Sequence, residues 1–207
     1  MQIILWLEIV GTIAFAISGA LVGRQKKMDL FGVAMLGLTT AVGGGVFRDL
    51  ILGLTPPAAF QQPAFAVIAL IVSVAVFFVP DDRATEKARG AYENALLLMD
   101  SLGLGLFTVV GVRTALLSSA EANAFLVTFV GVLTGVGGGV LRDMFAGLTP
   151  SIFVKHFYAS ASIIGAWVCA LLWSHAGDYA AMAVGACLIV VLRILAAHYR
   201  WNLPKGR

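Results

Sequence analysis

The chain has 207 residues, of which 60% are hydrophobic and only 12% are charged, and its formal net charge is +3. Soluble domains usually carry about 25% charged residues, so this composition excludes an ordinary soluble domain and indicates an integral membrane protein. The basic residues lie in loops beside apolar segments, which is typical of membrane topology and not of nucleic-acid binding. We therefore expect no nucleic-acid partner.

Seven apolar segments are predicted to cross a membrane as helices, each of which needs roughly 20 residues. In chain order they are residues 3–22, 29–53, 63–79, 95–116, 122–147, 153–174 and 179–197. A charged loop from Asp81 to Glu93 separates the third segment from the fourth. The sequence predicts an all-α membrane protein, with residues 1–207 in a single transmembrane domain.

The second and fifth segments contain the same motif. Residues 40–56, TAVGGGVFRDLILGLTP, return as residues 134–150, TGVGGGVLRDMFAGLTP, at an offset of 94. A weaker match at an offset of 92 relates Glu8, Gly11, Phe15 and Gly19 to Asp100, Gly103, Phe107 and Gly111. The chain therefore contains an internal duplication.

Three segments form each copy, so repeat one spans residues 1–80, repeat two spans 95–175, and the seventh helix, 179–197, has no counterpart. Because three is odd, the second copy must cross the membrane in the opposite direction, which is an inverted-topology repeat. Basic residues gather on one predicted side, at Arg24, Lys26, Lys27, Arg83, Lys87, Arg89, Arg142, Lys155, Arg200, Lys205 and Arg207. The other side holds Arg48 and Arg113. This bias predicts an outside N-terminus and a cytoplasmic C-terminus.

Polar residues within the spans concentrate on the first, second, fourth and fifth segments. The charged ones are Glu8, Arg48, Asp49, Asp100, Arg142 and Asp143, and the candidate pore hydroxyls are Ser18, Thr39, Thr40, Thr108 and Thr134. Ionisable residues in a span usually face the protein interior or water. A hydrophilic path is therefore predicted between these four helices, while the other three supply scaffold, lipid contact or subunit contact.

The glycine triplets of the motif allow two interpretations. They consist of Gly43, Gly44 and Gly45, and of Gly137, Gly138 and Gly139. Each glycine costs roughly 1 kcal/mol against alanine in a helix interior, which favours a functional kink or break that exposes carbonyl oxygens. Alternatively, small residues spaced four apart, such as Gly131 and Gly135, let helices pack closely. Both interpretations can hold together.

The arginine and aspartate of each motif are adjacent, and adjacent residues do not face each other on a helix. We therefore expect Arg48 and Arg142 to find partners across the repeat, or at Glu8 and Asp100. The alternative is that each arginine snorkels to the headgroups beside an aspartate at a helix end. The sequence leaves open whether these pairs gate a pore or anchor helix ends.

The paired Gly-Gly-Gly-Val-x-Arg-Asp segments and the three-plus-three-plus-one arrangement resemble the bacterial members of the trimeric intracellular cation (TRIC) channel family. The resemblance covers almost the whole chain. It implies a homotrimer in the bacterial inner membrane, with one pore per protomer that passes monovalent cations, chiefly K⁺ and also Na⁺. It also implies that the second and fifth helices kink at the glycine triplets and line the pore, and that membrane lipids are the other partners.

Three functions from different classes remain open at this point. Bacterial relatives have also been described as glycine transporters, so a secondary transporter of a small zwitterion is the alternative to a channel. A structural or assembly protein of the membrane is the third. The sequence contains no nucleotide loop, zinc motif or nucleophile–base arrangement, so an enzyme, a cofactor and a bound metal are not expected.

Overall fold

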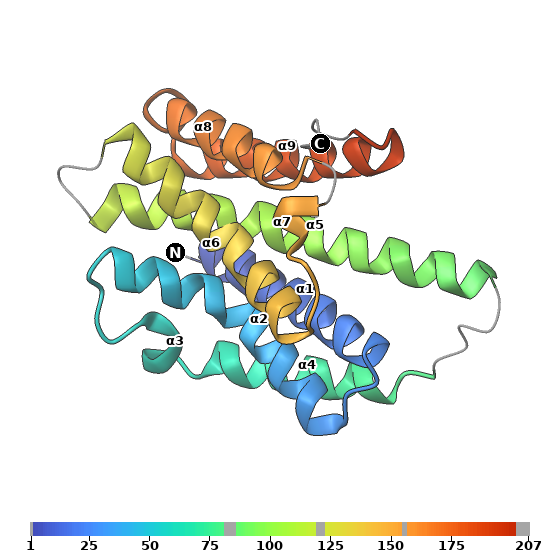
Figure 1. Cartoon of the computed structure of the whole chain (residues 1–207). Coiled ribbons are helices and arrows are strands. Elements are labelled where there is room, and N and C mark those ends of the chain that lie inside the picture. Colours follow the sequence, from blue (N-terminus) through green and yellow to red (C-terminus); the bar gives the residue numbers. More distant parts are fainter. Residues whose placement is uncertain (1, 81–85, 119–122, 155–156, 202–207) are drawn as a thin grey trace.

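The computed structural model describes residues 2–80, 86–118, 123–154 and 157–201, and this part of the chain is helical with connecting turns (Figure 1). The helices are α1 (Gln2–Gln25), α2 (Leu30–Ile51), α3 (Ala58–Gln61), α4 (Ala64–Phe78), α5 (Glu86–Ser118), α6 (Ala124–Phe145), α7 (Ser151–Val154), α8 (Tyr158–Ala176) and α9 (Asp178–His198). Among the described residues, α1, α2, α5, α6, α8 and α9 are long and apolar enough to cross a membrane. The third predicted segment is the shorter α4, with 15 residues.

Two helix boundaries differ clearly from the prediction. α5 begins at Glu86, so part of the charged stretch predicted as a loop is helix, because its Glu, Lys, Ala and Arg residues are good helix formers. The predicted sixth segment is divided into α7 and α8. Several basic residues used to orient the chain lie outside the described part, namely Arg83, Lys155, Lys205, Arg207 and the side chain of Lys87. The orientation stays a prediction.

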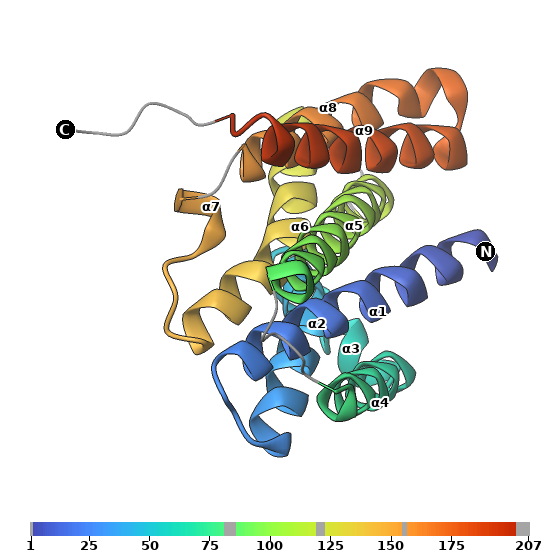
Figure 2. The same ribbon diagram turned by 90° about the vertical axis from the view of Figure 1, so that its right-hand side faces the viewer.

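The four helices that carry the predicted polar residues form the centre of the molecule (Figure 1). α1 packs against α2 and α5, and α6 packs against the same two helices. α4 lies against α1 and α2 on one side, whereas α8 and α9 cover α5 on the other (Figure 2). The polar residues of the central helices are thus enclosed by α4, α8 and α9.

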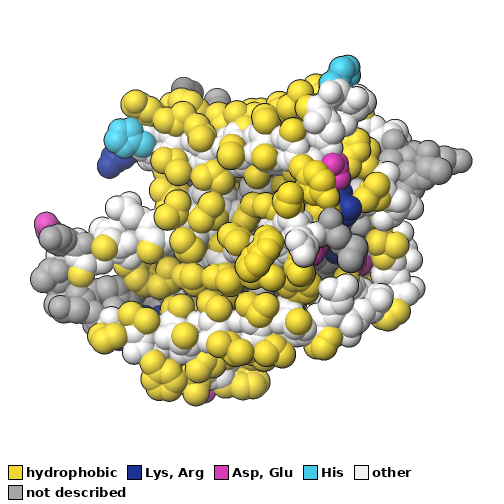
Figure 3. Space-filling model, turned by 180° about the vertical axis from the view of Figure 1, so that it is seen from behind, with side chains coloured by type: hydrophobic (Ala, Val, Ile, Leu, Met, Phe, Trp, Pro, Cys, Tyr) yellow, Lys and Arg dark blue, Asp and Glu magenta, His cyan; other side chains and the backbone are white. Residues whose placement is uncertain are grey.

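The outer surface is largely hydrophobic. In Figure 3, hydrophobic side chains cover most of the visible face, and the few charged groups lie near its ends. Large side chains such as Phe31, Phe125 and Phe153 are 73%, 77% and 76% exposed. Apolar exposure on this scale is expected where lipid or another subunit surrounds a protein.

The glycine triplets do not interrupt their helices, so a break of the helix is wrong, whereas a kink at the glycines stays a prediction. Both triplets lie inside single α-helices, the first in α2 and the second in α6. Where these helices cross, a Cβ on Gly44 would overlap the carbonyl oxygen of Thr134, and a Cβ on Gly138 would overlap that of Thr40. The middle glycines therefore let two backbones touch, and this close packing offsets their low helix propensity.

The two motif helices begin and end in the same way. Asp29 and Asn123 cap their starts, each accepting a backbone amide from three residues later. Gly53 and Gly147 follow their ends with φ angles of 69° and 64°, a left-handed conformation that glycine adopts without strain. In each copy the amide of the next leucine donates to the carbonyl oxygen of the motif aspartate at 2.8 Å. The repeated Gly-Leu-Thr-Pro sequence is thus a helix-ending signal, and it places each Arg-Asp pair in the last turn.

Candidate functional site

Each motif arginine pairs with the aspartate that follows it. Arg48 Nε donates to Asp49 Oδ1 at 2.7 Å, and Arg142 Nε donates to Asp143 Oδ1 at 2.9 Å. The prediction that these neighbours do not pair is wrong, because a long arginine side chain bends back to the next carboxylate although the two Cβ atoms point apart. All four side chains are buried, so neither arginine snorkels into open solvent.

The second oxygen of each aspartate holds the short helix that follows. Asp49 Oδ2 accepts the backbone amide of Ala58 at 2.8 Å, and Asp143 Oδ2 accepts that of Ser151 at 2.7 Å. Ala58 and Ser151 are the first residues of α3 and α7. Amides at a helix start have no partner within the helix, and a carboxylate satisfies them well. Both aspartates therefore anchor the chain after the motif helix.

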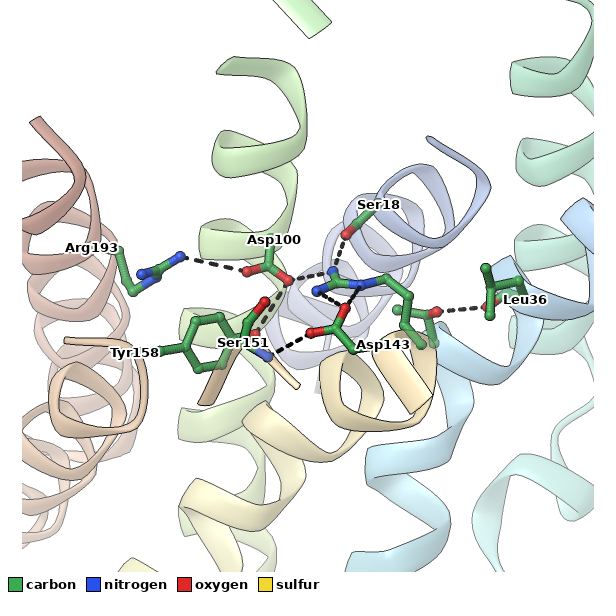
Figure 4. A network of polar contacts seen from close by, with 9 residues as sticks. Ser18, Leu36, Asp100, Asp143, Ser151, Tyr158 and Arg193 are labelled. Atoms are coloured by element: carbon green, nitrogen blue, oxygen red, sulfur yellow. Dashed lines mark hydrogen bonds and ion pairs between the residues drawn. The ribbon is translucent and has the colours of Figure 1, made fainter. Parts of the chain in front are cut away.

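Arg142 contacts further residues from other helices (Figure 4). Its Nη1 donates to Asp100 Oδ1 at 2.6 Å and to the hydroxyl of Ser18. The Tyr158 hydroxyl donates to the same Asp100 oxygen at 3.2 Å. Arg193 Nη2 lies 3.6 Å from Asp100 Oδ2, and the Arg193 guanidinium lies 4.5 Å from the centre of the Tyr158 ring. These residues and Asp143, from α1, α5, α6, α8 and α9, are called site two.

Site one consists of Glu8, Arg48, Asp49 and Arg113. Glu8 corresponds to Asp100 in the repeat, but it forms no hydrogen bond or ion pair with any described residue. Its half-buried carboxylate lies in the electric field of Arg48 and Arg113. Arg113 Nε is buried and has no hydrogen-bond partner within the described ranges. The acid and the motif arginine are thus apart in site one, and in contact in site two.

Pockets reach the two sites from opposite ends of α1. The site-one pocket has a cavity volume of about 60 Å³, and its lining includes Glu8, Thr12 and Arg48. Two pockets of about 440 and 330 Å³ border site two, and Arg142 and Gln25 line both. Since Glu8 lies near the start of α1 and Gln25 is its last residue, the pockets enter the central helices from opposite ends.

Packed side chains close the space between the two sites. Phe15 is 1% exposed, and its ring lies 5.3 Å from that of its repeat counterpart Phe107, centre to centre. A Cβ on Gly138 would approach the Phe15 ring to 3.2 Å, so the ring sits directly on the α2–α6 crossing. From Glu8 to Ser18, α1 rises about 15 Å at 1.5 Å per residue, and Phe15 lies between them.

The five predicted pore hydroxyls lie in different places. Ser18 belongs to site two. Thr40 and Thr134 are fully buried beside the α2–α6 crossing, and each donates to the carbonyl four residues earlier at 2.6 Å. Thr108 is hydrogen-bonded to a serine of α8 at 2.8 Å, and Thr39 lies in an outer apolar groove. Neither Thr39 nor Thr108 lines the pockets of site one or site two.

The last glycine of each triplet borders an Arg-Asp site, and the two differ in the space around them. A Cβ on Gly139 would lie 2.8 Å from the Tyr158 hydroxyl. A Cβ on Gly45 would meet nothing closer than Arg48 Nη2, at 3.9 Å. The first glycines, Gly43 and Gly137, face the opposite helix at the crossing. The Tyr158 hydroxyl thus fills the space beside Gly139, whereas the space beside Gly45 is empty.

Arg193 and Tyr158 are the residues of site two that the sequence interpretation missed. It treated the sixth and seventh segments as scaffold with apolar interiors. A signal was present, because Arg193 is a single charge inside the apolar run 188–197, and a charged residue within a span is a functional candidate by default. The sequence alone does not show that α9 turns this side toward α5.

Comparisons with known proteins match almost the whole chain. A family model described as "Glycine transporter" matches residues 5–81 and 97–174, which correspond to the two predicted repeats. The UPF0126 inner membrane protein YadS of Escherichia coli K12 is 37% identical over 202 residues, which cover 98% of this chain and 94% of YadS. This chain is accordingly similar to multi-pass bacterial membrane proteins.

Two solved structures share the fold. One is a TRIC trimeric intracellular cation channel orthologue from Rhodobacter sphaeroides, with 32% identity, a TM-score of 0.86 and coverage of 97% of this chain and 100% of that one. The other comes from work on the structural basis for conductance through TRIC cation channels, with 36% identity, a TM-score of 0.83 and coverage of 97% and 96%. Sequence and fold point to the same group of proteins.

Proposed function

The chain belongs to the bacterial TRIC channel family, and from this premise we propose that it is a membrane channel for monovalent cations, permeable to K⁺ and Na⁺. One observation carries the proposal: pockets enter the four central helices from opposite ends, and each stops at a buried Arg-Asp site. Charged groups inside a span mark ion pathways more often than they support packing. Conduction involves no chemical step, so the protein acts as a channel and not as an enzyme.

The proposed path follows one side of α1. A cation enters beside Glu8 and Thr12, passes the constriction at Phe15, and leaves beside Ser18 and Asp100. Carboxylate and hydroxyl oxygens replace part of its hydration shell, and an apolar constriction resists the passage of water until it widens. The chain contains no Thr-Val-Gly-Tyr-Gly filter sequence, so we expect modest selectivity between K⁺ and Na⁺.

Site two is proposed to be the closed gate, and site one the open entrance. Arg142 connects α6 to Asp100 on α5 and to Ser18 on α1, so it must release these contacts before an ion can pass. Glu8 faces its pocket without such a contact. Asp143 accepts the first backbone amide of α7 and so anchors that helix. We therefore assign anchoring to the motif aspartates and gating to Arg142.

The fold is proposed to be an inverted repeat of residues 1–80 and 95–175, followed by the unpaired helix 179–197 in one transmembrane domain. Matching caps, terminal glycines, Arg-Asp pairs and aspartate-to-loop contacts in the two copies support this topology. With its 15 residues, α4 is about 22 Å long, so the bilayer must thin locally if α4 spans it. The Lys and Arg bias places the N-terminus outside and the C-terminus in the cytoplasm.

We propose a homotrimer in the bacterial inner membrane, with one pore inside each protomer. The Rhodobacter sphaeroides orthologue is described as trimeric, and its likeness covers 97% of this chain. The exposed apolar side chains leave ample surface for contacts with other protomers and with lipid, whereas the polar residues lie between the helices of one protomer. Each protomer therefore contains a complete set of pathway residues.

Planar bilayer recordings with purified protein test the channel. Under a KCl gradient we expect unitary currents that reverse near the K⁺ equilibrium potential, and no unitary current or reversal near the Cl⁻ potential would contradict the proposal. The variant Phe15→Ala should raise the unitary conductance, because it removes the ring between the two sites. Phe153→Ala is the matched control, since that ring is 76% exposed on α7.

A second candidate is a secondary transporter of a small zwitterion such as glycine. The site-one pocket offers a carboxylate on Glu8 for an ammonium group and a guanidinium on Arg48 for a carboxylate. The description of the matching family model points the same way. Saturable, gradient-driven uptake of glycine into liposomes, without channel current, would favour this candidate over the channel.

A further inference from the structure

The helix that lies outside the repeat brings a second guanidinium to the acid of site two. Arg193 on α9 is 3% exposed, and its Nη2 lies 3.6 Å from Asp100 Oδ2. Its guanidinium also stacks on the ring of Tyr158, 4.5 Å from the centre (Figure 4). Arg193 lies five residues before the end of α9, and a charged residue within a span is costly, so its enclosure beside a carboxylate indicates an electrostatic role.

The charges of site two form a row of alternating sign. Asp143 contacts Arg142 at 2.9 Å, Arg142 contacts Asp100 at 2.6 Å, and Asp100 lies 3.6 Å from Arg193. When the contact between Arg142 and Asp100 breaks, Arg142 remains paired with Asp143, and Asp100 remains beside Arg193. Without Arg193, the same separation leaves Asp100 with no cation at ion-pair distance among the described residues. A buried carboxylate without a cation is strongly unfavourable, and the Tyr158 hydroxyl would then be the one group of site two left beside Asp100.

Site one has a similar set of charges, but its acid, Glu8, is not in contact with its motif arginine, Arg48. Arg48 stays paired with Asp49 at 2.7 Å, whereas Glu8 forms no ion pair with any described residue. Arg113 on α5 supplies the second guanidinium whose field reaches Glu8. One molecule therefore contains both forms of the row, closed in site two and parted in site one.

The helices around site two pack too closely for the row to part by a shift of a whole helix. A Cβ on Gly105 of α5 would lie 3.0 Å from the carbonyl oxygen of Ala186 on α9, so these two backbones are in direct contact. α6 packs on α5 just as closely, because a Cβ on Gly135 of α6 would lie 2.9 Å from the carbonyl oxygen of Leu104. Helices this close slide past each other only with difficulty. The contact between Arg142 and Asp100 therefore parts when the long Arg142 side chain reorients toward Asp143, while the helices stay in place.

We propose that Arg193 is a positioning residue that keeps Asp100 electrically compensated when Arg142 withdraws, so that the gate can open. The inference rests on the proposed channel function and extends it by giving the unpaired helix α9 a role in gating. Removal of Arg193 should stabilise the closed form. Removal of the Asp100 charge as well should abolish this effect, because no carboxylate then needs a partner.

Single-channel recordings of Arg193→Met and of Arg193→Met combined with Asp100→Asn test the proposal. We expect the open probability of Arg193→Met to fall at least about tenfold, since opening now unpairs a buried charge. Its unitary conductance and reversal potential should change little. The double variant should open as often as the wild type or more often. An Arg193→Met channel that opens like the wild type, or a double variant that stays closed, overturns the proposal.

Two controls separate this inference from folding and from the channel function. Arg193→Lys keeps the charge, so it should restore most of the opening lost in Arg193→Met. A double-mutant cycle on the thermal unfolding of purified protein needs no current, and Asp100→Asn should cost less stability in the Arg193→Met background than in the wild type. If the two substitutions have additive effects on stability, the role of Arg193 is contradicted but the channel function is not. If the wild-type protein gives no current in the bilayer, the channel function itself is contradicted.

Discussion

The two copies of the repeated motif share a backbone but not an environment. Both helices are capped, ended and anchored in the same way, and both motif arginines bind the next aspartate. In site two, however, Arg142 also binds Asp100 and Ser18, whereas Arg48 in site one has no further ion pair with a described residue. Arg142 is 2% exposed and Arg48 is 8% exposed. The duplicated sequence fixes local geometry, and the surrounding helices decide what each copy does.

The difference arises from contacts that α8 and the unpaired α9 make around site two. They bring Tyr158 and Arg193 to Asp100, whereas Glu8 in site one has no hydrogen bond or ion pair with any described residue. A symmetric fold can thus hold one closed and one accessible site. This teaches that the unpaired seventh helix is part of the functional centre and not merely scaffold.

The strongest test of the difference removes each motif arginine. Arg142→Met should lower the free energy of unfolding by about 3–5 kcal/mol, because it removes the cation beside buried Asp143 and leaves Asp100 with Arg193 alone. Arg48→Met should cost about half as much, since it breaks one ion pair, to Asp49, and not two. Denaturant unfolding in detergent measures the stability of both variants. Equal losses of unfolding free energy would contradict the difference between the two sites.

At the α2–α6 crossing, unlike at the two sites, equivalent substitutions in the two copies should cost similar amounts of stability. Gly44→Ala and Gly138→Ala each drive a Cβ into a carbonyl oxygen of the other helix, so each should cost about 1–3 kcal/mol. The two losses should agree within about 0.5 kcal/mol. If only one variant is destabilised in unfolding experiments, the crossing does not lie on the symmetry axis of the repeat.

Alanine substitution of the last glycine of each triplet should again change the stability differently in the two copies. Gly139→Ala brings a methyl group against the Tyr158 hydroxyl and should cost about 1–2 kcal/mol. Gly45→Ala has room, and alanine's better helix propensity should stabilise α2 by up to about 1 kcal/mol. Thermal unfolding midpoints should therefore shift in opposite directions, and shifts of the same sign would contradict the contrast in packing.

The smallest expected effect concerns a single hydroxyl of site two. Ser18→Ala removes one hydrogen bond from Arg142 and should cost about 1 kcal/mol. Thr39→Ala is the matched control on the outer groove and should change the stability by less than about 0.5 kcal/mol. If both variants unfold like the wild type, the contact between α1 and Arg142 does not contribute to the closed site.

Much of the fold could be predicted from the sequence because apolar length and duplication are strong signals. The positions of the long helices follow from segment length, and the repeat follows from two nearly identical motifs. The prediction of a break at the glycines failed because low helix propensity cannot distinguish a helix that stops from a continuous helix that another backbone approaches. That choice depends on tertiary packing.

The site was predicted in part. The sequence offered a partner across the repeat, or Glu8 and Asp100, for the motif arginines; the contact between Asp100 and Arg142 confirms Asp100, whereas Glu8 forms no ion pair with a described residue. It did not predict the bonds between adjacent residues, since these depend on how a long side chain folds back. It also missed Arg193, because α9 is apolar around most of its surface and gives no sign of which face meets α5.

The most direct test of the central claim compares Asp100→Asn with Glu8→Gln in the same planar bilayers. If site two is the closed gate and site one the entrance, Asp100→Asn should raise the open probability, because Arg142 loses the contact that holds it on α5. Glu8→Gln should leave the open probability unchanged and weaken the preference for cations over anions, because it removes a carboxylate from the entrance pocket. An increase in open probability that is as large in Glu8→Gln, or a decrease in Asp100→Asn, would contradict the account.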